Sequence, residues 1–233
     1  MISVYHINLG LTDFAECWEI QKQIHLYKQI HDCPDLIITT EHNHVYTLGR
    51  TGDRNNLLLS EKSLKEKNIS YYEIDRGGDL TYHGPGQLVC YPLFDLKHFY
   101  LDTHKYLRDL EEAVILTLRN YGIKGERDEG LTGVWVGNEK ICAIGIKVSK
   151  WITMHGLAFN INNELNHFGG IIPCGILHKG VTSLKESYGA GINMEELNDY
   201  FIKSLASVFN IEKVSIDVGR LNKIFELELD TDR

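Results

Sequence analysis

Cys174 has a setting that suits nucleophilic chemistry. It stands between Pro173 and Gly175 in the run IIPCGILHKG. Because proline and glycine disfavour a regular helix or a central strand, we expect this thiol on an accessible loop. Cationic side chains nearby would favour the thiolate, which is the reactive form of a cysteine. The sequence therefore makes Cys174 a candidate for covalent catalysis.

The other four cysteines lie in or beside apolar periodic segments, and we predict that they are inert core residues. They are Cys17, Cys33, Cys90 and Cys142. Five cysteines cannot all pair within one chain, and no C-x-x-C spacing occurs, so neither a disulfide framework nor a zinc ribbon is indicated. A reducing compartment, the cytoplasm, is therefore expected.

A second unusual feature is the glycine-rich run RGGDLTYHGPGQLVCYPLFDL over residues 76–96. Glycines at this density allow the backbone to approach a ligand closely and to adopt positive φ. Arg76, Tyr82 and His83 add a cation, a phenol and a titratable donor. Composition alone leaves two interpretations open. The run is either a ligand-binding loop or a tight loop between two strands, in which His83 is a structural histidine.

Other classes of site lack their motifs. No G-x-G-x-x-G opens a helix, and G-x-x-x-x-G-K-[ST] and G-x-S-x-G are absent, so nucleotide-binding loops and serine hydrolases are not indicated. His42 and His44 would share a strand face, but no third ligand at a suitable spacing accompanies them, so no metal is expected. The net charge of −8 argues against a general nucleic-acid binder.

Length and composition predict one soluble domain. The 233 residues, 43% of them hydrophobic and 24% charged, are enough to bury an ordinary globular core. No linker or repeat interrupts the chain, so we predict a single domain over residues 1–233. No secretory signal is visible, and apolar stretches such as 141–146 fall far short of the ~20 residues of a membrane-spanning helix.

The elements that must position these residues are three amphipathic helices and several short strands. Thr12 or Asp13 caps the first helix. Thr103 caps the second, Gly122 ends it in a left-handed conformation, and Asn193 opens the third. The strands are predicted over 36–40, 45–48, 69–74, 88–93, 134–136, 140–148 and 152–159, with a closing segment over 213–218.

The connections between these strands decide the fold class. Gly137 and Asn138 form a hairpin turn, and several other loops are too short for a helical crossover. The sheet should therefore be mixed or partly antiparallel, which gives an α/β or α+β class and not a doubly wound sheet. Residues 190–233 are read only as a C-terminal helix and tail.

Taken in order, several of these stretches resemble one family. The blocks RGGDLTYHGPGQLV, YPLFDL, GVWVG, KICAIGIKV, MHGLAFNIN, PCGI and GVTSL resemble the octanoyltransferases of lipoate biosynthesis, the lipoyl(octanoyl) transferases. The match spans residues 36–185, about two thirds of the chain, and separate blocks in order are more specific than any one motif.

The resemblance implies both a fold and an activity. The fold is that of the biotin and lipoate protein ligases: a mixed central sheet flanked by helices, with a smaller second sheet. The activity is transfer of octanoyl from octanoyl-acyl carrier protein to the lysine of apo lipoyl domains, in 2-oxoacid dehydrogenase E2 subunits and glycine-cleavage H protein. The donor carries a phosphopantetheine thioester, so neither ATP nor metal is expected as a cofactor, and we expect a monomer.

The resemblance also assigns residues. It makes Cys174 of PCGI the nucleophile and Lys140 of KICAIG its partner, although Lys140 alone would read as a solvent-exposed hairpin lysine. His83 and His155 could support an oxyanion or a proton transfer. The acyl site comprises three segments: Arg76, Gly77, Gly78, Asp79, Leu80, Thr81, Tyr82 and His83; Ala143, Ile144 and Gly145; and Gly156, Leu157 and Ala158.

The residue types fit these roles. A thiolate attacks a thioester readily, a nearby ammonium favours the thiolate, and an acyl-enzyme divides the transfer into two easier steps. The small residues Ala143, Gly145 and Gly156 are expected to leave room for an eight-carbon chain. Three alternatives remain open at this point: an ATP-dependent lipoate or biotin ligase, an octanoyl amidotransferase acting between lipoyl domains, and a non-catalytic binding module.

Overall fold

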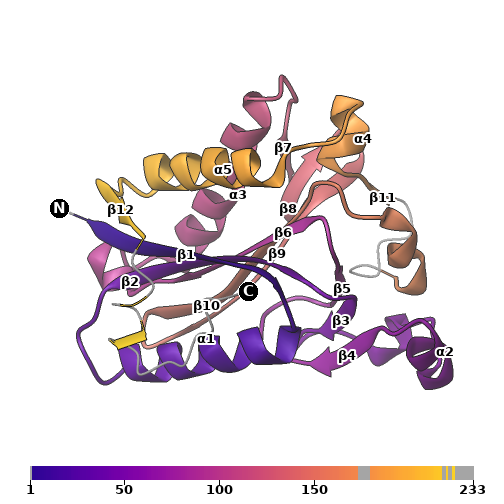
Figure 1. Ribbon diagram of the computed structural model, residues 1–233, viewed down its shortest axis with the longest axis horizontal. Helices are drawn as coiled ribbons and strands as arrows, with labels where there is room; N and C mark the ends of the chain where they lie inside the picture. The colour runs from indigo at the N-terminus through magenta and orange to yellow at the C-terminus, as the bar shows by residue number, and fades with distance from the viewer. Residues whose placement is uncertain (1, 173–178, 217–218, 220–221, 224–233) are drawn as a thin grey trace.

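The computed structural model describes residues 2–172, 179–216, 219 and 222–223, and within them two sheets organise the chain (Figure 1). The nine strands described for the larger sheet include β11 (Gly180–Val181), which pairs with β9 beside the main path. Along that path the order is β12 (Lys213–Ser215), β1 (Ser3–Thr12), β2 (Asp35–His42), β6 (Gln87–Leu93), β10 (Ile152–Asn160), β9 (Glu139–Ser149), β8 (Leu131–Val136) and β7 (Glu126–Asp128).

Strand direction confirms the predicted mixed sheet. β1 runs parallel to β2 and β12, whereas each neighbouring pair from β2 to β7 along the sheet is antiparallel. A smaller sheet packs beside it, with β3 (Val45–Leu48) between β4 (Ser70–Glu73) and β5 (Leu80–His83). Strands β1, β5, β7 and β11 were not predicted. β5 falls inside the glycine-rich run, where turn-forming residues hide four strand residues.

Three long helices cover the large sheet, as predicted. They are α1 (Phe14–Lys28), α3 (Thr103–Arg119) and α5 (Met194–Val208). Asp13 and Asn193 cap the first and third, each accepting two backbone N–H groups. The predicted Thr103 cap is wrong, because the Asp102 carboxylate accepts the Lys105 N–H at 2.9 Å. Shorter helices are α2 (Glu61–Glu66) and α4 (Leu184–Tyr188), with 3₁₀ turns η1 (Arg54–Asn56), η2 (Leu96–His98) and η3 (Leu165–Gly170).

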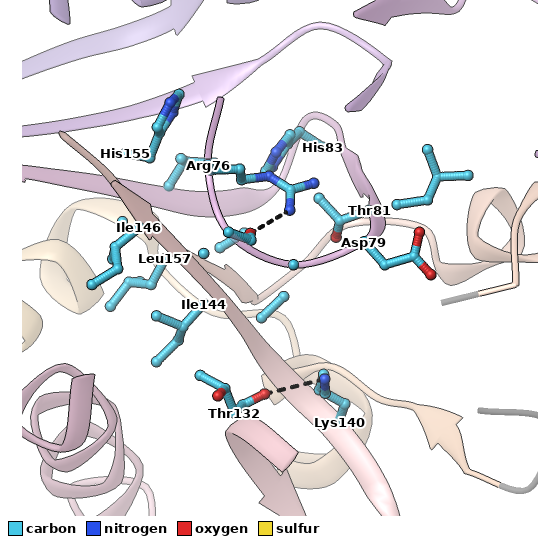
Figure 2. Close-up of a pocket in the computed structure, with 18 of the residues that line it drawn as sticks. Arg76, Asp79, Thr81, His83, Thr132, Lys140, Ile144, Ile146, His155 and Leu157 are labelled. Carbon is cyan, nitrogen blue, oxygen red and sulfur yellow. Dashed lines mark hydrogen bonds between the residues drawn. The ribbon is translucent and has the colours of Figure 1, made fainter. Parts of the chain in front are cut away.

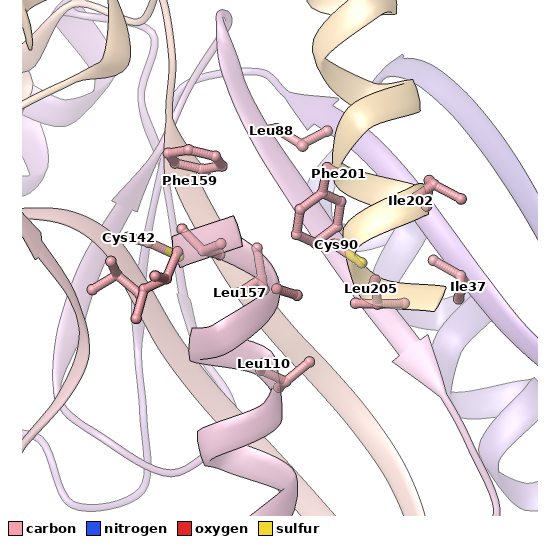
Figure 3. Packing of buried hydrophobic residues seen from close by; sticks show 14 of the residues in the cluster. Ile37, Leu88, Cys90, Leu110, Cys142, Leu157, Phe159, Phe201, Ile202 and Leu205 are labelled. Carbon is pink, nitrogen blue, oxygen red and sulfur yellow. The ribbon is translucent and has the colours of Figure 1, made fainter. Parts of the chain in front are cut away.

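The two faces of the large sheet have separate cores. Helices α3 and α5 lie on one face and α1 on the other (Figure 1). Strand alternation sorts the side chains of β6, since Cys90 packs beneath α3 and α5 while Val89 and Tyr91 belong to the α1 core. Leu110 of α3 and Phe201 of α5 belong to the same core cluster as Cys90 (Figure 3). The cysteines in these cores are packing residues.

No helix in the described ranges has the length and apolar character needed to cross a bilayer.

Buried histidines couple the stability of this fold to pH. Burial lowers the pKa of His6 and His42 to about 4 and that of His83 to about 3. A folded-state pKa below the unfolded value of about 6.5 means that the unfolded chain binds more protons as the pH falls below 6.5, so stability is lost towards pH 4. A hydrogen bond to Asp35 raises the pKa of His98. The stability that His98 contributes is therefore fully present below about pH 6.5 and does not oppose the stability lost at the buried histidines.

We predict that lowering the pH from 6.5 to 5.0 reduces the free energy of unfolding by about 1 to 2 kcal/mol for each such histidine. Urea unfolding midpoints at the two pH values measure this. His42→Gln, which can still bond the Tyr91 hydroxyl, should show a smaller pH dependence than wild type. An unchanged wild-type midpoint would contradict the assignment of neutral buried imidazoles.

Candidate active site

A cavity of about 540 Å³ lies where the two sheets meet. Strands β9 and β10 form one wall, and the loop before β5 forms another. Most of the residues assigned from sequence line it: Arg76, Gly77, Gly78, Asp79, Leu80, Thr81, His83, Lys140, Ala143, Ile144, Gly145, His155, Gly156, Leu157 and Ala158. Figure 2 shows Arg76 and His155 towards one end and Lys140 towards the other.

The register of β9 and β10 places four small residues together. Ala143 lies opposite Ala158, and Gly145 lies opposite Gly156, so all four project from the same face. A Cβ on Gly145 would come within 2.8 Å of the Gly77 carbonyl oxygen, and one on Gly156 within 2.1 Å of the Cys90 carbonyl oxygen. The two glycines therefore admit neighbouring backbone, and the expectation that they leave room for ligand is wrong for these two positions.

The Arg76 loop is fixed to both sheets. The Gly77 N–H donates to the Ile146 carbonyl at 2.9 Å, which joins the loop to β9. The Arg76 guanidinium is buried and donates from Nη2 to the Thr47 carbonyl at 2.6 Å, which joins it to β3. Gly78 has a φ of +91°, where glycine is favoured, so the loop can turn back towards β5.

Side chains alternate along β5 beyond this loop. Thr81 and His83 line the cavity. Tyr82 does not; it packs on the other side against Tyr46 and His167, and its hydroxyl lies 2.7 Å from His44 Nδ1. Successive side chains of a strand point to opposite faces, so Tyr82 packs in the core of the small sheet while Thr81 and His83 face the cavity.

His83 is a neutral imidazole by its surroundings. It stacks on Phe14, and burial lowers its pKa to about 3. The Gln87 amide nitrogen donates to Asn160 Oδ1, so Gln87 Oε1 faces His83 and accepts from Nδ1–H at 2.9 Å. The remaining nitrogen, Nε2, then carries a lone pair. This geometry lets Nε2 accept a hydrogen bond, and it does not let Nε2 donate one to an oxyanion.

His155 belongs to a second polar cluster. It has a φ of +61°, an uncommon conformation for a residue with a side chain, and its N–H donates to Gln21 Oε1 at 3.1 Å. Its Nε2–H donates to Asp75 at 2.8 Å, while Lys147 binds the other carboxylate oxygen at 2.6 Å. The hydrogen bond from His155 lowers the pKa of Asp75, whereas burial lowers the pKa of His155. Nε2 is thus committed to Asp75.

Lys140 lines the cavity from β9, next to a register shift in the β8–β9 hairpin. Its Nζ donates to the Thr132 carbonyl at 3.3 Å and lies 4.8 Å from the centre of the Trp135 ring. Gly133 has a φ of +127°, and a Cβ there would lie 3.4 Å from Lys140 Cε and 2.5 Å from the Cys142 carbonyl oxygen. The bare glycine admits the Cys142 carbonyl oxygen, and the Lys140 stem lies at ordinary contact distance from where a Cβ would be. Lys140 is therefore part of the cavity wall, unlike a solvated hairpin lysine.

Cys174 lies outside the described residues. On either side of it in the chain, Phe168 and Val181 line the cavity, and Val181 pairs with Lys140 across β11 and β9. The Ile172 N–H donates to the Asn56 carbonyl at 2.8 Å. The chain before and after residues 173–178 therefore contributes Phe168 and Val181 to the cavity wall.

The four described cysteines are buried in the reduced form. Burial raises the pKa of the Cys17 thiol to about 12, and it raises the thiol pKa values of Cys33, Cys90 and Cys142 as well. A thiol with a raised pKa carries little thiolate near neutral pH. Among the described residues, therefore, no cysteine has the environment of a nucleophile.

The two histidines considered for a metal do not share a site. His42 Nε2 lies 2.8 Å from the Tyr91 hydroxyl, whereas His44 contacts Tyr82 in the core of the small sheet. Within the part of the chain that the structure describes, no group of three or more histidine, cysteine, aspartate or glutamate residues is placed to hold a metal ion.

Several residues of the cavity were not singled out from sequence. Gln87 and Asn160 lie inside the motif blocks, and as amides at the ends of apolar strands they could have been noticed. Phe14 and Leu107 come from helices distant in sequence, and no local pattern connects them to the site.

Known proteins share both the sequence pattern and the fold of this chain. Residues 13–206 match the model of the lipoyl protein ligase A/B catalytic domain. A Christiangramia forsetii protein named octanoyltransferase is 50% identical over 88% of this chain and 95% of its own length, and a Cytophaga hutchinsonii protein of the same name is 45% identical over 90% and 93%. A crystal structure of lipoate-protein ligase A bound with ATP has a TM-score of 0.77 at 13% identity, covering 96% of this chain and 93% of that one, which establishes the fold. The chain therefore belongs to the lipoyl protein ligase A/B catalytic-domain family, among acyltransferases of the octanoyltransferase group.

Proposed function

We propose that this enzyme transfers octanoyl from octanoyl-acyl carrier protein to the lysine of apo lipoyl domains, through a thioester on Cys174. The observation that carries the proposal is the cavity between the sheets: it is walled by Lys140 at one end, and the described chain on both sides of residues 173–178 lines it. The high identity to proteins named octanoyltransferase supports the acyl group.

The proposed first step forms the acyl-enzyme. The Cys174 thiolate attacks the carbonyl carbon of the donor thioester, and the carbon–sulfur bond to phosphopantetheine breaks as that thiol leaves with a proton. Lys140, as an ammonium, favours the Cys174 thiolate and can give the proton to the leaving group. Because a thioester is already activated, this step needs neither ATP nor a metal.

The second step releases the product. The acceptor lysine, after losing a proton, attacks the acyl carbon, an amide bond forms, and the Cys174 thiolate is restored. Lys140, which has given its proton to the leaving thiol in the first step, receives the proton released as the amide bond forms. The acceptors in this proposal are the lipoyl domains of 2-oxoacid dehydrogenase E2 subunits and glycine-cleavage H protein.

The cavity also suits the acyl chain. Ile144, Ile146 and Leu157 supply apolar walls. Burying each methylene of the chain contributes roughly 0.8 kcal/mol before the costs of binding. Ala143 and Ala158 leave more of the cavity open than larger side chains would at the same positions.

The covalent step gives the first prediction of the mechanism. Incubation with octanoyl-acyl carrier protein, without ATP, adds one octanoyl mass to the wild-type chain, and hydroxylamine removes it because thioesters are labile. Cys174→Ser abolishes this adduct. Cys33→Ser is the matched control, since Cys33 does not line the cavity, and it keeps the adduct. A hydroxylamine-labile adduct on Cys174→Ser, or acylation that requires ATP as in a ligase, would contradict the proposal.

Lys140 gives a second prediction. If its ammonium favours the thiolate, iodoacetamide alkylation of Cys174 titrates below the unperturbed thiol pKa of about 8.5. Lys140→Ala moves that titration to higher pH and lowers kcat/KM by about 100-fold. Lys203→Ala, on the exposed side of α5, changes neither. A profile that stays in place without Lys140 would show that this lysine does not stabilise the thiolate.

The cavity wall gives a third prediction. Ala143→Leu fills space beside β10, so the ratio of kcat/KM for octanoyl to that for butyryl donors falls by about tenfold or more. Ala190→Leu, at an exposed position outside the cavity, leaves the ratio unchanged. An unchanged ratio for Ala143→Leu would mean that the chain binds elsewhere.

A further inference from the structure

Glu111 is a fully buried carboxylate on α3 whose contacts reach the β8–β9 hairpin. Its Oε2 accepts from Arg108 Nη1 at 2.7 Å and from Arg127 Nε at 3.0 Å. Its Oε1 has a different partner, the backbone N–H of Gly133 at 3.0 Å. The carboxylate therefore does more than neutralise two arginines, because one oxygen is aimed at the main chain of β8.

The Gly133 N–H belongs to the same peptide unit as the carbonyl that accepts the hydrogen bond from Lys140. The peptide between Thr132 and Gly133 presents its N–H to Glu111 and its carbonyl oxygen to Lys140 Nζ, 3.3 Å away. A peptide unit is planar and rigid, so a bond that orients its N–H also orients its carbonyl. A hydrogen bond to an ionised acceptor is stronger than a hydrogen bond to a neutral acceptor. It also polarises the peptide, which makes the peptide carbonyl a better acceptor for an ammonium group.

The hairpin itself leaves this peptide in need of an anchor. The β8–β9 register shifts between Val134 and Trp135, next to Gly133, so regular pairing does not fix the orientation there. Gly133 also has a φ of +127°, a conformation that a side chain would strain. The Glu111 carboxylate supplies the fixed point below this irregular segment.

We propose that Glu111 is a positioning residue for Lys140, acting through the Thr132–Gly133 peptide. Glu111 lies on α3 beneath the hairpin and is outside the residues that line the cavity. The consequence for catalysis rests on the proposed function of Lys140, whereas the structural link between Glu111 and Lys140 does not.

The variants separate this role from simple burial of charge. Glu111→Leu removes the acceptor at similar volume, and Glu111→Gln keeps an oxygen for the Gly133 N–H but not the charge. Glu112→Gln is the matched control, because Glu112 also binds Arg127, at 2.7 Å, but does not contact Gly133. Arg108 and Arg127 are partly exposed, so both can turn to water when Glu111 is replaced.

Two readouts are measured on folded protein, with thermal unfolding as the check on folding. The first is the rate at which acetic anhydride labels the Lys140 amine, by peptide mass spectrometry, relative to exposed Lys150 in the same chain. The second is kcat/KM together with the pH profile of Cys174 alkylation. The labelling readout does not depend on the proposed activity.

We expect Glu111→Leu to label Lys140 several-fold faster, to lower kcat/KM by about tenfold and to move the alkylation profile towards that of Lys140→Ala. Glu111→Gln shows a smaller effect, about threefold, and Glu112→Gln shows none. Adding Glu111→Leu to Lys140→Ala costs no further activity, since both remove the same interaction.

Unchanged Lys140 labelling in folded Glu111→Leu would overturn the proposal. If Glu111→Leu does not fold, Glu111→Gln decides in the same way. A shift in labelling without any effect of Lys140→Ala on Cys174 would instead leave the positioning link standing and remove the proposed role of Lys140.

Discussion

The contact between the Arg76 loop and β9 is the constraint on which this site depends. β8 pairs with β9 as far as Cys142, and the loop takes over the same edge where the Gly77 N–H donates to Ile146. That approach is possible because Gly145 has no side chain beneath the loop. The small sheet is thereby held against the large one, and the cavity is the space left between them.

Charge is distributed unevenly along that cavity. Burial lowers the pKa values of His83 and His155, so both imidazoles are neutral near pH 7. The negative charge of Asp75 is paired with Lys147. Lys140 stands at the opposite end (Figure 2). Apolar residues such as Ile144 and Leu157 lie between the buried Arg76 guanidinium at one end and Lys140 at the other. The proposed acyl thioester likewise has an apolar chain and a reacting group that develops negative charge.

Local patterns predicted much of this fold because local forces determine it. Asp13 and Asn193 cap helices as expected, and the Gly137 turn closes the predicted hairpin. Features that depend on distant chain were missed. β5 is a strand because it pairs with β3, and the space at Gly145 is taken up by the backbone of a loop that lies far away in sequence. No sequence pattern reveals either.

The motif blocks named most of the cavity residues, but they could not assign roles that depend on orientation. In the proposed mechanism the acyl group is held covalently by the enzyme between donor and acceptor. The most direct test isolates the octanoylated enzyme, removes the donor, and mixes the enzyme with an apo lipoyl domain in a rapid-quench experiment. We predict that octanoyl appears on the lipoyl lysine at least as fast as steady-state turnover; an adduct that persists, or that transfers more slowly than turnover, would contradict the acyl-enzyme mechanism.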